Sequence, residues 1–231
     1  MAKNNEDLKE IKNHRRVNDI LLGPLERPAI QWLVERLPAW VTPDHLTILG
    51  LLAAILIGAS YALTNLNKNY LWLATFGFFL NWFGDSLDGN LARFRKIERP
   101  QYGFFVDHVV DTASEVIIFI GIGLSPYVDL NLALLALVGY LSMACLVYIN
   151  TMVQGVFKIS YGRLGPTEIR VIAMLANTLV YFLGNPKMPW LDLTLYNALI
   201  IFIIALLVVF FVTTTIKQAV KLDQIDRKKW S

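Results

Sequence analysis

Residues 81–115 read NWFGDSLDGNLARFRKIERPQYGFFVDHVVDTASE, and this stretch joins two long apolar runs of the chain. Two carboxylates, Asp85 and Asp88, stand three residues apart at the end of the first run. Two more, Asp107 and Asp111, stand four residues apart at the start of the second run. Residues three or four apart share one face of a helix, so each run predicts a helix that presents a pair of carboxylates.

These two runs belong to a larger set of apolar runs, which decides the fold class. Each run has about 15 to 24 residues, close to the roughly 20 that a helix needs to cross a bilayer. The six runs cover residues 46–63, 70–91, 107–124, 132–153, 169–183 and 193–216. Only 17% of the chain is charged, whereas soluble domains carry about 25%. We therefore predict an all-α integral membrane protein with six transmembrane helices.

The basic residues are distributed unevenly between the two sides of these spans. Nineteen of the 21 Lys and Arg residues fall in the N-terminal segment, the loops after the second and fourth spans, and the C-terminal tail. The other two, Lys68 and Lys187, fall in the alternate loops. The positive-inside rule therefore predicts that both termini are cytoplasmic. For this multi-pass protein we expect the plasma membrane of a bacterium or an archaeon.

The spans divide the chain into three parts. Residues 1–40 form a cytoplasmic N-terminus, residues 41–216 the six-helix transmembrane domain, and residues 217–231 a cytoplasmic basic tail. Apolar and charged side chains mix around residues 28–37, which predicts a short amphipathic helix in the membrane interface. A soluble helix packed on the loops is the alternative. The single cysteine, Cys145, excludes an intrachain disulfide.

Four carboxylates at the edge of a membrane need a counter-charge. One charged side chain in the membrane costs about 3 kcal/mol or more, and mutually repelling charges cost more. Hard divalent cations such as Mg²⁺ bind carboxylate oxygens and keep positions open for phosphate oxygens. A site for one or two metal ions at the four aspartates is the simplest explanation, with Glu115, one turn further along, as a supporting partner.

Small and basic residues accompany the aspartates. Gly89, Ala92 and Gly103 each stand four residues from an aspartate, so a bulky group can approach the helices closely there. Four basic residues near the site suit phosphate; these are Arg93, Arg95, Lys96 and Arg99. A single aspartate at a helix end is often only a cap, and His108 is either a structural residue or a substrate contact.

The same positions make the chain similar to the CDP-alcohol phosphotransferase family. The family pattern is D-x2-D-G-x2-A-R-x8-G-x3-D-x3-D, and all of its defined positions are matched. They are Asp85, Asp88, Gly89, Ala92, Arg93, Gly103, Asp107 and Asp111. Nine residues, in place of eight, separate Arg93 from Gly103. The extra residue falls in a loop, where insertions are tolerated.

This resemblance implies an enzyme of phospholipid biosynthesis that transfers a substituted phosphate from a CDP-linked donor to an alcohol and releases CMP. The four aspartates would hold Mg²⁺ or Mn²⁺, and Asp111 would also be the general base. Gly89, Ala92 and Gly103 would make room for the cytidine nucleotide, with Arg93 beside it. Members of the family often form homodimers. We therefore expect a homodimer in contact with membrane lipid, and no nucleic-acid partner.

Two branches of the family remain open. On family base rates, CDP-diacylglycerol is slightly favoured as donor, with a polar acceptor. Arg163 and Arg170 would then bind the phosphate of an anionic acceptor, or they merely follow the positive-inside pattern. The pair Asp107-His108 instead resembles the branch that transfers from CDP-choline or CDP-ethanolamine to a lipid alcohol.

Two readings from other classes of protein compete with an enzyme. Intramembrane carboxylates also line the paths of ion or metal transporters. A transporter would need polar residues on more spans and across the full depth of the membrane, whereas these acids gather at one side. A non-catalytic scaffold would leave the acids unexplained.

Overall fold

The computed structural model describes residues 21–154, 165–188 and 193–227. Within these ranges the chain is helical and forms no strand beyond a single antiparallel bridge between Lys187 and Thr194. The helices are α2 (Gly23–Arg36), α3 (Pro43–Leu63), α4 (Tyr70–Phe94), α5 (Pro100–Gly123), α6 (Leu130–Gln154), α7 (Pro166–Leu183) and α8 (Leu195–Arg227). Each apolar run predicted as a span is thus a helix.

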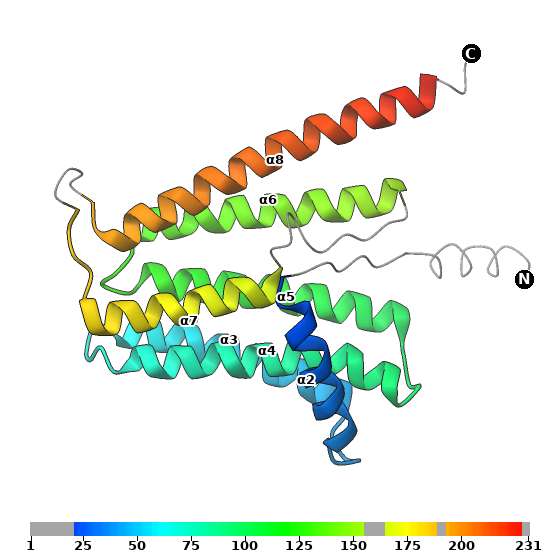
Figure 1. Ribbon diagram of the computed structural model, residues 1–231, viewed down its shortest axis with the longest axis horizontal. Coiled ribbons are helices and arrows are strands. Elements are labelled where there is room, and N and C mark those ends of the chain that lie inside the picture. Colours follow the sequence, from blue (N-terminus) through cyan, green and yellow to red (C-terminus); the bar gives the residue numbers. More distant parts are fainter. Residues whose placement is uncertain (1–20, 155–164, 189–192, 228–231) are drawn as a thin grey trace, which may run out of the picture.

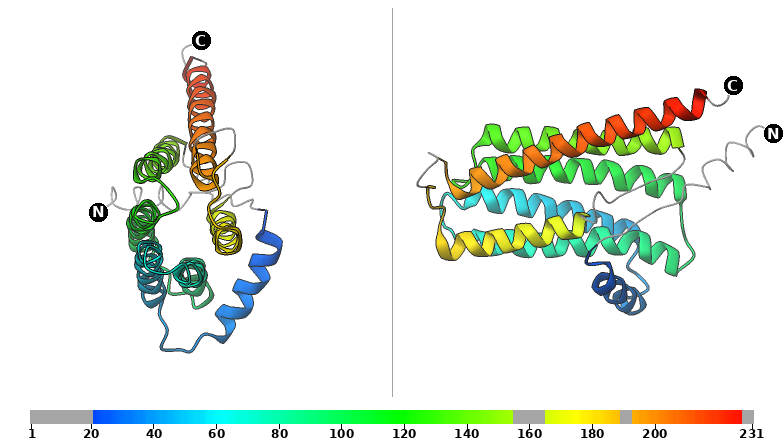
Figure 2. Two further views of the ribbon diagram at one scale, coloured as in Figure 1. Left: turned by 90° about the vertical axis from the view of Figure 1, so that its left-hand side faces the viewer. Right: turned by 45° about the horizontal axis from the view of Figure 1, so that its top comes forward.

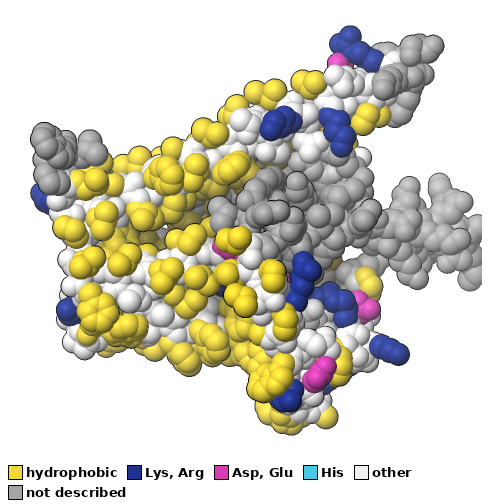
Figure 3. Space-filling view, viewed as in Figure 1, with side chains coloured by type: hydrophobic (Ala, Val, Ile, Leu, Met, Phe, Trp, Pro, Cys, Tyr) yellow, Lys and Arg dark blue, Asp and Glu magenta, His cyan; other side chains and the backbone are white. Residues whose placement is uncertain are grey.

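The helices α3 to α8 run side by side, and α2 lies across them near one end (Figures 1 and 2). Among the described residues, three helices are long and apolar enough to cross a membrane on length and composition alone: Pro43–Leu63, Leu130–Val153 and Leu195–Arg227. In the face shown in Figure 3, hydrophobic side chains cover most of the flank, and most visible Lys and Arg side chains gather toward one end. The chain is therefore an integral membrane protein.

The ends of three helices follow from their sequences. Thr42 caps α3, since its hydroxyl accepts a hydrogen bond from the His45 backbone N at 3.3 Å and the His45 ring accepts one from the Thr42 backbone N. His45 therefore has a structural role. The helix α2 begins earlier than residue 28 and contains Pro28. The helix α8 continues past residue 216, where Arg227 pairs with Asp223 at 2.8 Å.

The helix α3 packs against both α4 and α5 through glycines. A Cβ atom on Gly84 of α4 would lie 2.5 Å from the Leu46 carbonyl oxygen and 2.6 Å from the Gly50 nitrogen. A Cβ on Gly121 of α5 would lie 2.3 Å from the Gly58 Cα. Small residues at helix crossings let backbones approach closely. The α3, α4 and α5 backbones are therefore in direct contact.

The helix α7 packs on the other side of α4, and α8 packs on α6. A buried hydrogen bond of 2.8 Å joins the Tyr61 hydroxyl of α3 to Asn177 of α7, and Asn177 donates to the Thr75 hydroxyl of α4 at 3.2 Å. These polar groups are satisfied inside an otherwise apolar cluster that includes Ile57 and Phe78. They attach the second half of α7 to the α3–α4 pair.

Candidate functional site

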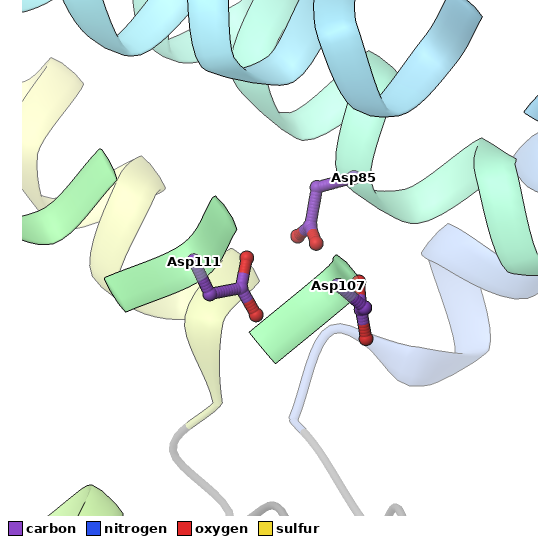
Figure 4. A group of neighbouring side chains, drawn as sticks. All are labelled: Asp85, Asp107 and Asp111. Atoms are coloured by element: carbon purple, nitrogen blue, oxygen red, sulfur yellow. The ribbon is translucent and has the colours of Figure 1, made fainter. Parts of the chain in front are cut away.

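Three aspartates from two helices meet at one point. Asp85 reaches from α4 toward Asp107 and Asp111 on α5 (Figure 4). One carboxylate oxygen from each residue lies within 4.8 Å of the other two. Oxygen ligands on opposite sides of a Mg²⁺ ion lie about 4.2 Å apart, because each Mg–O distance is about 2.1 Å. Small side-chain rotations would therefore bring the three carboxylates around one cation.

Asp85, Asp107 and Asp111 line a small recess between the helices, and the buried Asp88 lines it too. Asp88 does not belong to the group of aspartates whose oxygens lie within 4.8 Å of one another. The Thr47 hydroxyl of α3 donates to the Asp88 carboxylate at 2.7 Å. The recess is lined by Thr47, Gly50, Asn81, Asp85, Asp88, Asp107, Val110, Asp111 and Ser114. Thus α3 supplies a residue, Thr47, that the sequence did not single out. Its only signal there is a hydroxyl within an apolar run.

Arg170 of α7 supplies a positive charge next to these carboxylates. Its Nη2 atom lies 2.7 Å from the Asp85 carboxylate, and its Nε donates to the Asn81 side-chain oxygen at 2.8 Å. Asn81 in turn donates to the Gly50 carbonyl at 2.9 Å. The Arg170 side chain is only 12% exposed, and its buried Nη1 has no hydrogen-bond partner among the described residues. Arg163 lies outside the described residues.

One guanidinium cannot balance the cluster. The side chains of Asp85, Asp107 and Asp111 carry more negative charge than Arg170 can neutralise, and burial strengthens their mutual repulsion. Glu115, one turn further into α5, adds a further carboxyl group, which interacts with Tyr140 of α6 and with Arg170. The arrangement therefore favours an additional cation bound between the helices.

The glycines predicted to make room for the nucleotide have more open space around them than Gly84 and Gly121, which contact other helices. A Cβ on Gly103 would meet nothing within 4 Å, and one on Gly89 would meet only the Arg93 guanidinium, at 3.5 Å. Ala92, between them in sequence, is half-buried. Arg93 donates to the Asn90 side-chain oxygen at 3.0 Å. Neither glycine is therefore required for packing among the described helices.

Two of the predicted phosphate-binding residues hold the fold together. Arg95, the C-cap of α4, donates to the Leu37 carbonyl at 3.0 Å and the Pro38 carbonyl at 2.9 Å, so it binds the end of α2. Arg99 forms an ion pair with Asp44 at the start of α3. Both guanidinium groups thus have structural partners on the α2–α3 segment.

His108 lies beside the aspartate cluster and also lines a groove along α5. Its Nδ1 atom is 3.6 Å from the Asp107 carboxylate and 2.8 Å from the Phe104 carbonyl. Its ring stacks on Phe104 with centroids 4.1 Å apart. It also lines an apolar groove of about 640 Å³ between α5 and Tyr148 of α6. His108 therefore lies between the face of α5 that carries Asp107 and this groove.

The chain is similar to known proteins along most of its length. A family model described as CDP-alcohol phosphatidyltransferase matches residues 40–212. Cholinephosphotransferase 1 of Gallus gallus is 29% identical over 189 residues, which cover 77% of this chain and 55% of that protein. Archaetidylinositol phosphate synthase of Methanothermobacter thermautotrophicus is 30% identical over 173 residues, covering 74% of this chain and 83% of that protein.

A shorter match has a higher identity. Phosphatidylinositol phosphate synthase of Cutibacterium acnes is 39% identical over 89 residues, which cover 38% of this chain and 40% of that protein. The chain spans about half the length of the cholinephosphotransferases it matches.

Proposed function

Because the chain belongs to the CDP-alcohol phosphatidyltransferase family, we propose that it transfers a substituted phosphate group from a CDP-linked donor to an alcohol and releases CMP. The observation that carries this proposal is the group of three carboxylates within 4.8 Å of one another, next to a buried Arg170. Phosphoryl transfer depends mainly on positioning and on neutralising negative charge. This arrangement suits both requirements.

The donor atoms fit a divalent cation such as Mg²⁺ or Mn²⁺, since all of them are carboxylate oxygens and their charge exceeds that of Arg170. Asp85, Asp107 and Asp111 would hold this cation, with Asp88 as the fourth ligand, held by Thr47. When bound, the cation neutralises negative charge on the diphosphate and on the leaving CMP.

The chain's own residues would carry the remaining steps. Asp111 would accept the proton of the attacking hydroxyl as the hydroxyl oxygen forms a bond to phosphorus and the bond from phosphorus to CMP breaks. Gly89, Ala92 and Gly103 would leave room for the cytidine nucleotide, and Arg93 would lie beside it. The open space in front of Gly103 supports this assignment.

For the substrates, we favour CDP-diacylglycerol as donor and an anionic, polar alcohol as acceptor. Arg170 supports this choice, because its buried Nη1 has no hydrogen-bond partner in the described chain and can donate to a phosphate oxygen. Arg163 would be a second ligand of the same phosphate. The match to archaetidylinositol phosphate synthase, over 83% of that protein, agrees with this branch.

A second candidate is transfer from CDP-choline or CDP-ethanolamine to a lipid alcohol. One specific observation favours it: His108 lies 3.6 Å from Asp107 and lines the apolar groove along α5, where a lipid could approach. The similarity to cholinephosphotransferase 1 agrees with this branch. An ion or metal transporter is disfavoured because the four aspartates lie in the halves of α4 and α5 that adjoin the loop between them and do not continue along the full length of these helices.

The setting proposed for this reaction is a membrane with both termini on its cytoplasmic side. Six spans, over α3 to α8, would give this topology, and the gathering of basic side chains toward one end supports it. The helix α2 would then lie in the cytoplasmic interface, where its exposed Leu25 and Trp32 suit lipid headgroups. A homodimer is proposed from the family alone.

The deciding experiment measures CMP release by the purified full chain. Each CDP-linked donor is paired with a panel of alcohols, in the presence of Mg²⁺, of Mn²⁺ or of EDTA. CMP release with CDP-diacylglycerol and a phosphorylated alcohol would support the favoured branch, and release with CDP-choline and diacylglycerol the second. No metal-dependent CMP release from any pair would overturn the proposed function.

A further inference from the structure

One carboxylate outside the metal cluster joins three helices. The Oε1 atom of Glu26, on α2, accepts hydrogen bonds from the Trp82 indole at 2.8 Å and from the Ser86 hydroxyl at 3.3 Å, both on α4. The same atom accepts a third bond, from the Thr167 hydroxyl of α7, at 2.8 Å. Glu26 is half-buried and does not line the recess that contains the aspartates.

The donors of these bonds stand next to the pair formed by Asp85 and Arg170. Ser86 follows Asp85 directly in α4, and Trp82 precedes it by three residues. Thr167 precedes Arg170 by three residues, so the two share one face of α7. Glu26 therefore binds α4 and α7 within one turn of the ion pair that connects these helices to each other.

Within the described residues, the start of α7 has few attachments besides those of Glu26 and Arg170. Glu168 accepts a hydrogen bond from the Leu22 backbone N at 2.7 Å, which ties the same turn to the start of α2 (Figure 1). The contacts of Asn177 to α3 and α4 lie about 15 Å further along the helix, since each residue rises about 1.5 Å. The position of Arg170 thus depends on α2 at one end and on Asn177 at the other.

We propose that Glu26 is a positioning residue, which holds the first turn of α7 against α4 and so keeps the Arg170 guanidinium on Asp85 and Asn81. Glu26 lies outside the lining of the metal recess and acts through Arg170. The inference rests on the proposed function only for its kinetic readout, because the position of α7 can be measured without any reaction.

Two variants separate this role from a general loss of stability. Glu26→Gln keeps an oxygen that can accept the same hydrogen bonds, whereas Glu26→Ala removes it. Glu35→Ala is the matched control, since Glu35 also lies on α2 but pairs only with the exposed Gln31 among the described side-chain bonds. If Glu26→Ala fails to fold, the variant Thr167→Val takes its place in every measurement. Thr167→Val removes only the hydrogen-bond donor on α7.

The first measurement is structural. Spin labels are attached at Phe94→Cys and Ile172→Cys, both exposed positions, with Cys145 replaced by Ser. Pulsed electron spin resonance on the full chain in nanodiscs gives the distance between the C-terminal end of α4 and the second turn of α7. We expect a shifted or broader distance distribution in Glu26→Ala and an unchanged one in Glu26→Gln and Glu35→Ala. An unchanged distribution in Glu26→Ala overturns the inference.

The second measurement is kinetic. Hydrogen bonds to a charged group are worth about 1.5–3 kcal/mol, so we expect the acceptor KM to rise about tenfold or more in Glu26→Ala, and the kcat to change less. In an Arg170→Ala background the same substitution should add nothing to KM, because both changes remove one interaction. Independent, additive effects would overturn the inference. A shifted distance without CMP release in any variant, including the unmodified chain, would instead overturn only the proposed function.

Discussion

The Arg170 guanidinium of α7 lies 2.7 Å from the Asp85 carboxylate of α4. This pair connects the arginine that we propose binds the acceptor to an aspartate of the proposed metal site. One nitrogen of Arg170 is engaged by Asp85 and another by Asn81, which leaves Nη1 directed at no protein acceptor in the described chain. Arg170 therefore combines a partner that holds it in place with a buried donor that a ligand can use.

We expect Arg170→Gln to impair use of a phosphorylated acceptor more than use of an uncharged alcohol. The neutral side chain loses the charge-assisted hydrogen bond to phosphate, which is about twice as strong as a neutral one. The measurement is the acceptor KM for a matched pair of alcohols with and without phosphate, with Arg227→Gln, an exposed position on α8, as control. Equal effects on both alcohols would assign Arg170 to the metal cluster alone.

Chelation of divalent cations should abolish activity, and Mg²⁺ or Mn²⁺ should restore it. The cluster of three carboxylates with one guanidinium carries excess negative charge, which a cation must balance. Asp85→Asn and Asp88→Asn should lose metal binding and nucleotide binding together. Titration of Mn²⁺ followed by electron spin resonance measures the metal directly. Full turnover in excess EDTA would end the metal assignment.

Thr47→Val should weaken metal binding although Thr47 carries no charge. Its hydroxyl donates to Asp88 at 2.7 Å, and partners that orient metal ligands typically contribute about 10- to 100-fold to metal affinity. Thr47→Ser keeps the hydroxyl and should bind Mn²⁺ as the unmodified chain does. If Val and Ser variants bind the ion equally well, the hydrogen bond has no part in forming the site.

Asp111→Asn should separate binding from chemistry. The amide cannot accept the proton of the attacking hydroxyl, so turnover should fall by roughly 10²–10⁴-fold. Binding of the CDP-linked donor should weaken only modestly, because Asp85 and Asp107 remain near the cation. Nucleotide titration and CMP release on the same preparation give both values. Near-normal turnover would remove Asp111 from the base role, and loss of nucleotide binding would make it a metal ligand first.

Gly121→Ala should destabilise the helix bundle, and Gly103→Ala should not. The new methyl of Gly121→Ala would lie 2.3 Å from the Gly58 Cα, so α3 and α5 must separate, at a cost of about 1–3 kcal/mol. The methyl at residue 103 would meet nothing within 4 Å. Thermal unfolding in detergent compares the two, and equal Tm values would show that α3 and α5 pack differently. Because Gly103→Ala should leave the packing of the helices unchanged, any loss of nucleotide binding in this variant would show that the methyl group occupies space that the nucleotide needs.

The helices α3, α4, α6 and α7 could be predicted to within three residues because long apolar runs bounded by polar loops leave few alternatives. The helix α5 begins at Pro100, seven residues before its predicted start, because its first two turns are more polar than the rest of the helix. The helix α2 begins at Gly23, five residues before the helix predicted around residues 28–37. In the structure Pro28 is an interior residue of α2, where it lacks the N–H that would bond within the helix, and α2 nevertheless continues through it. The end of α8 was missed because residues 217–227 are polar, although most of them favour helix.

The candidate site was predictable where it depends on spacing along one helix, as for Asp107 and Asp111. The contact between Arg170 and Asp85 depends on how α7 packs on α4, which no local pattern contains. Thr47 was missed for a similar reason. A threonine in an apolar helix usually bonds back to its own chain, and Thr47 does contact the Pro43 carbonyl at 3.2 Å; only the packing of α3 on α4 adds Asp88.

The backbone contacts at Gly84 and Gly121 mean that the two helices carrying the aspartates are each held against α3 without intervening side chains. The helix α7, which carries Arg170, is attached by side-chain contacts such as those of Val180 and by separate polar bonds at Glu26 and Asn177. The first arrangement tolerates almost no substitution, whereas the second can be altered one bond at a time. Acceptor preference should therefore be exchangeable by redesigning α7, while the three-helix frame around the carboxylates is left untouched.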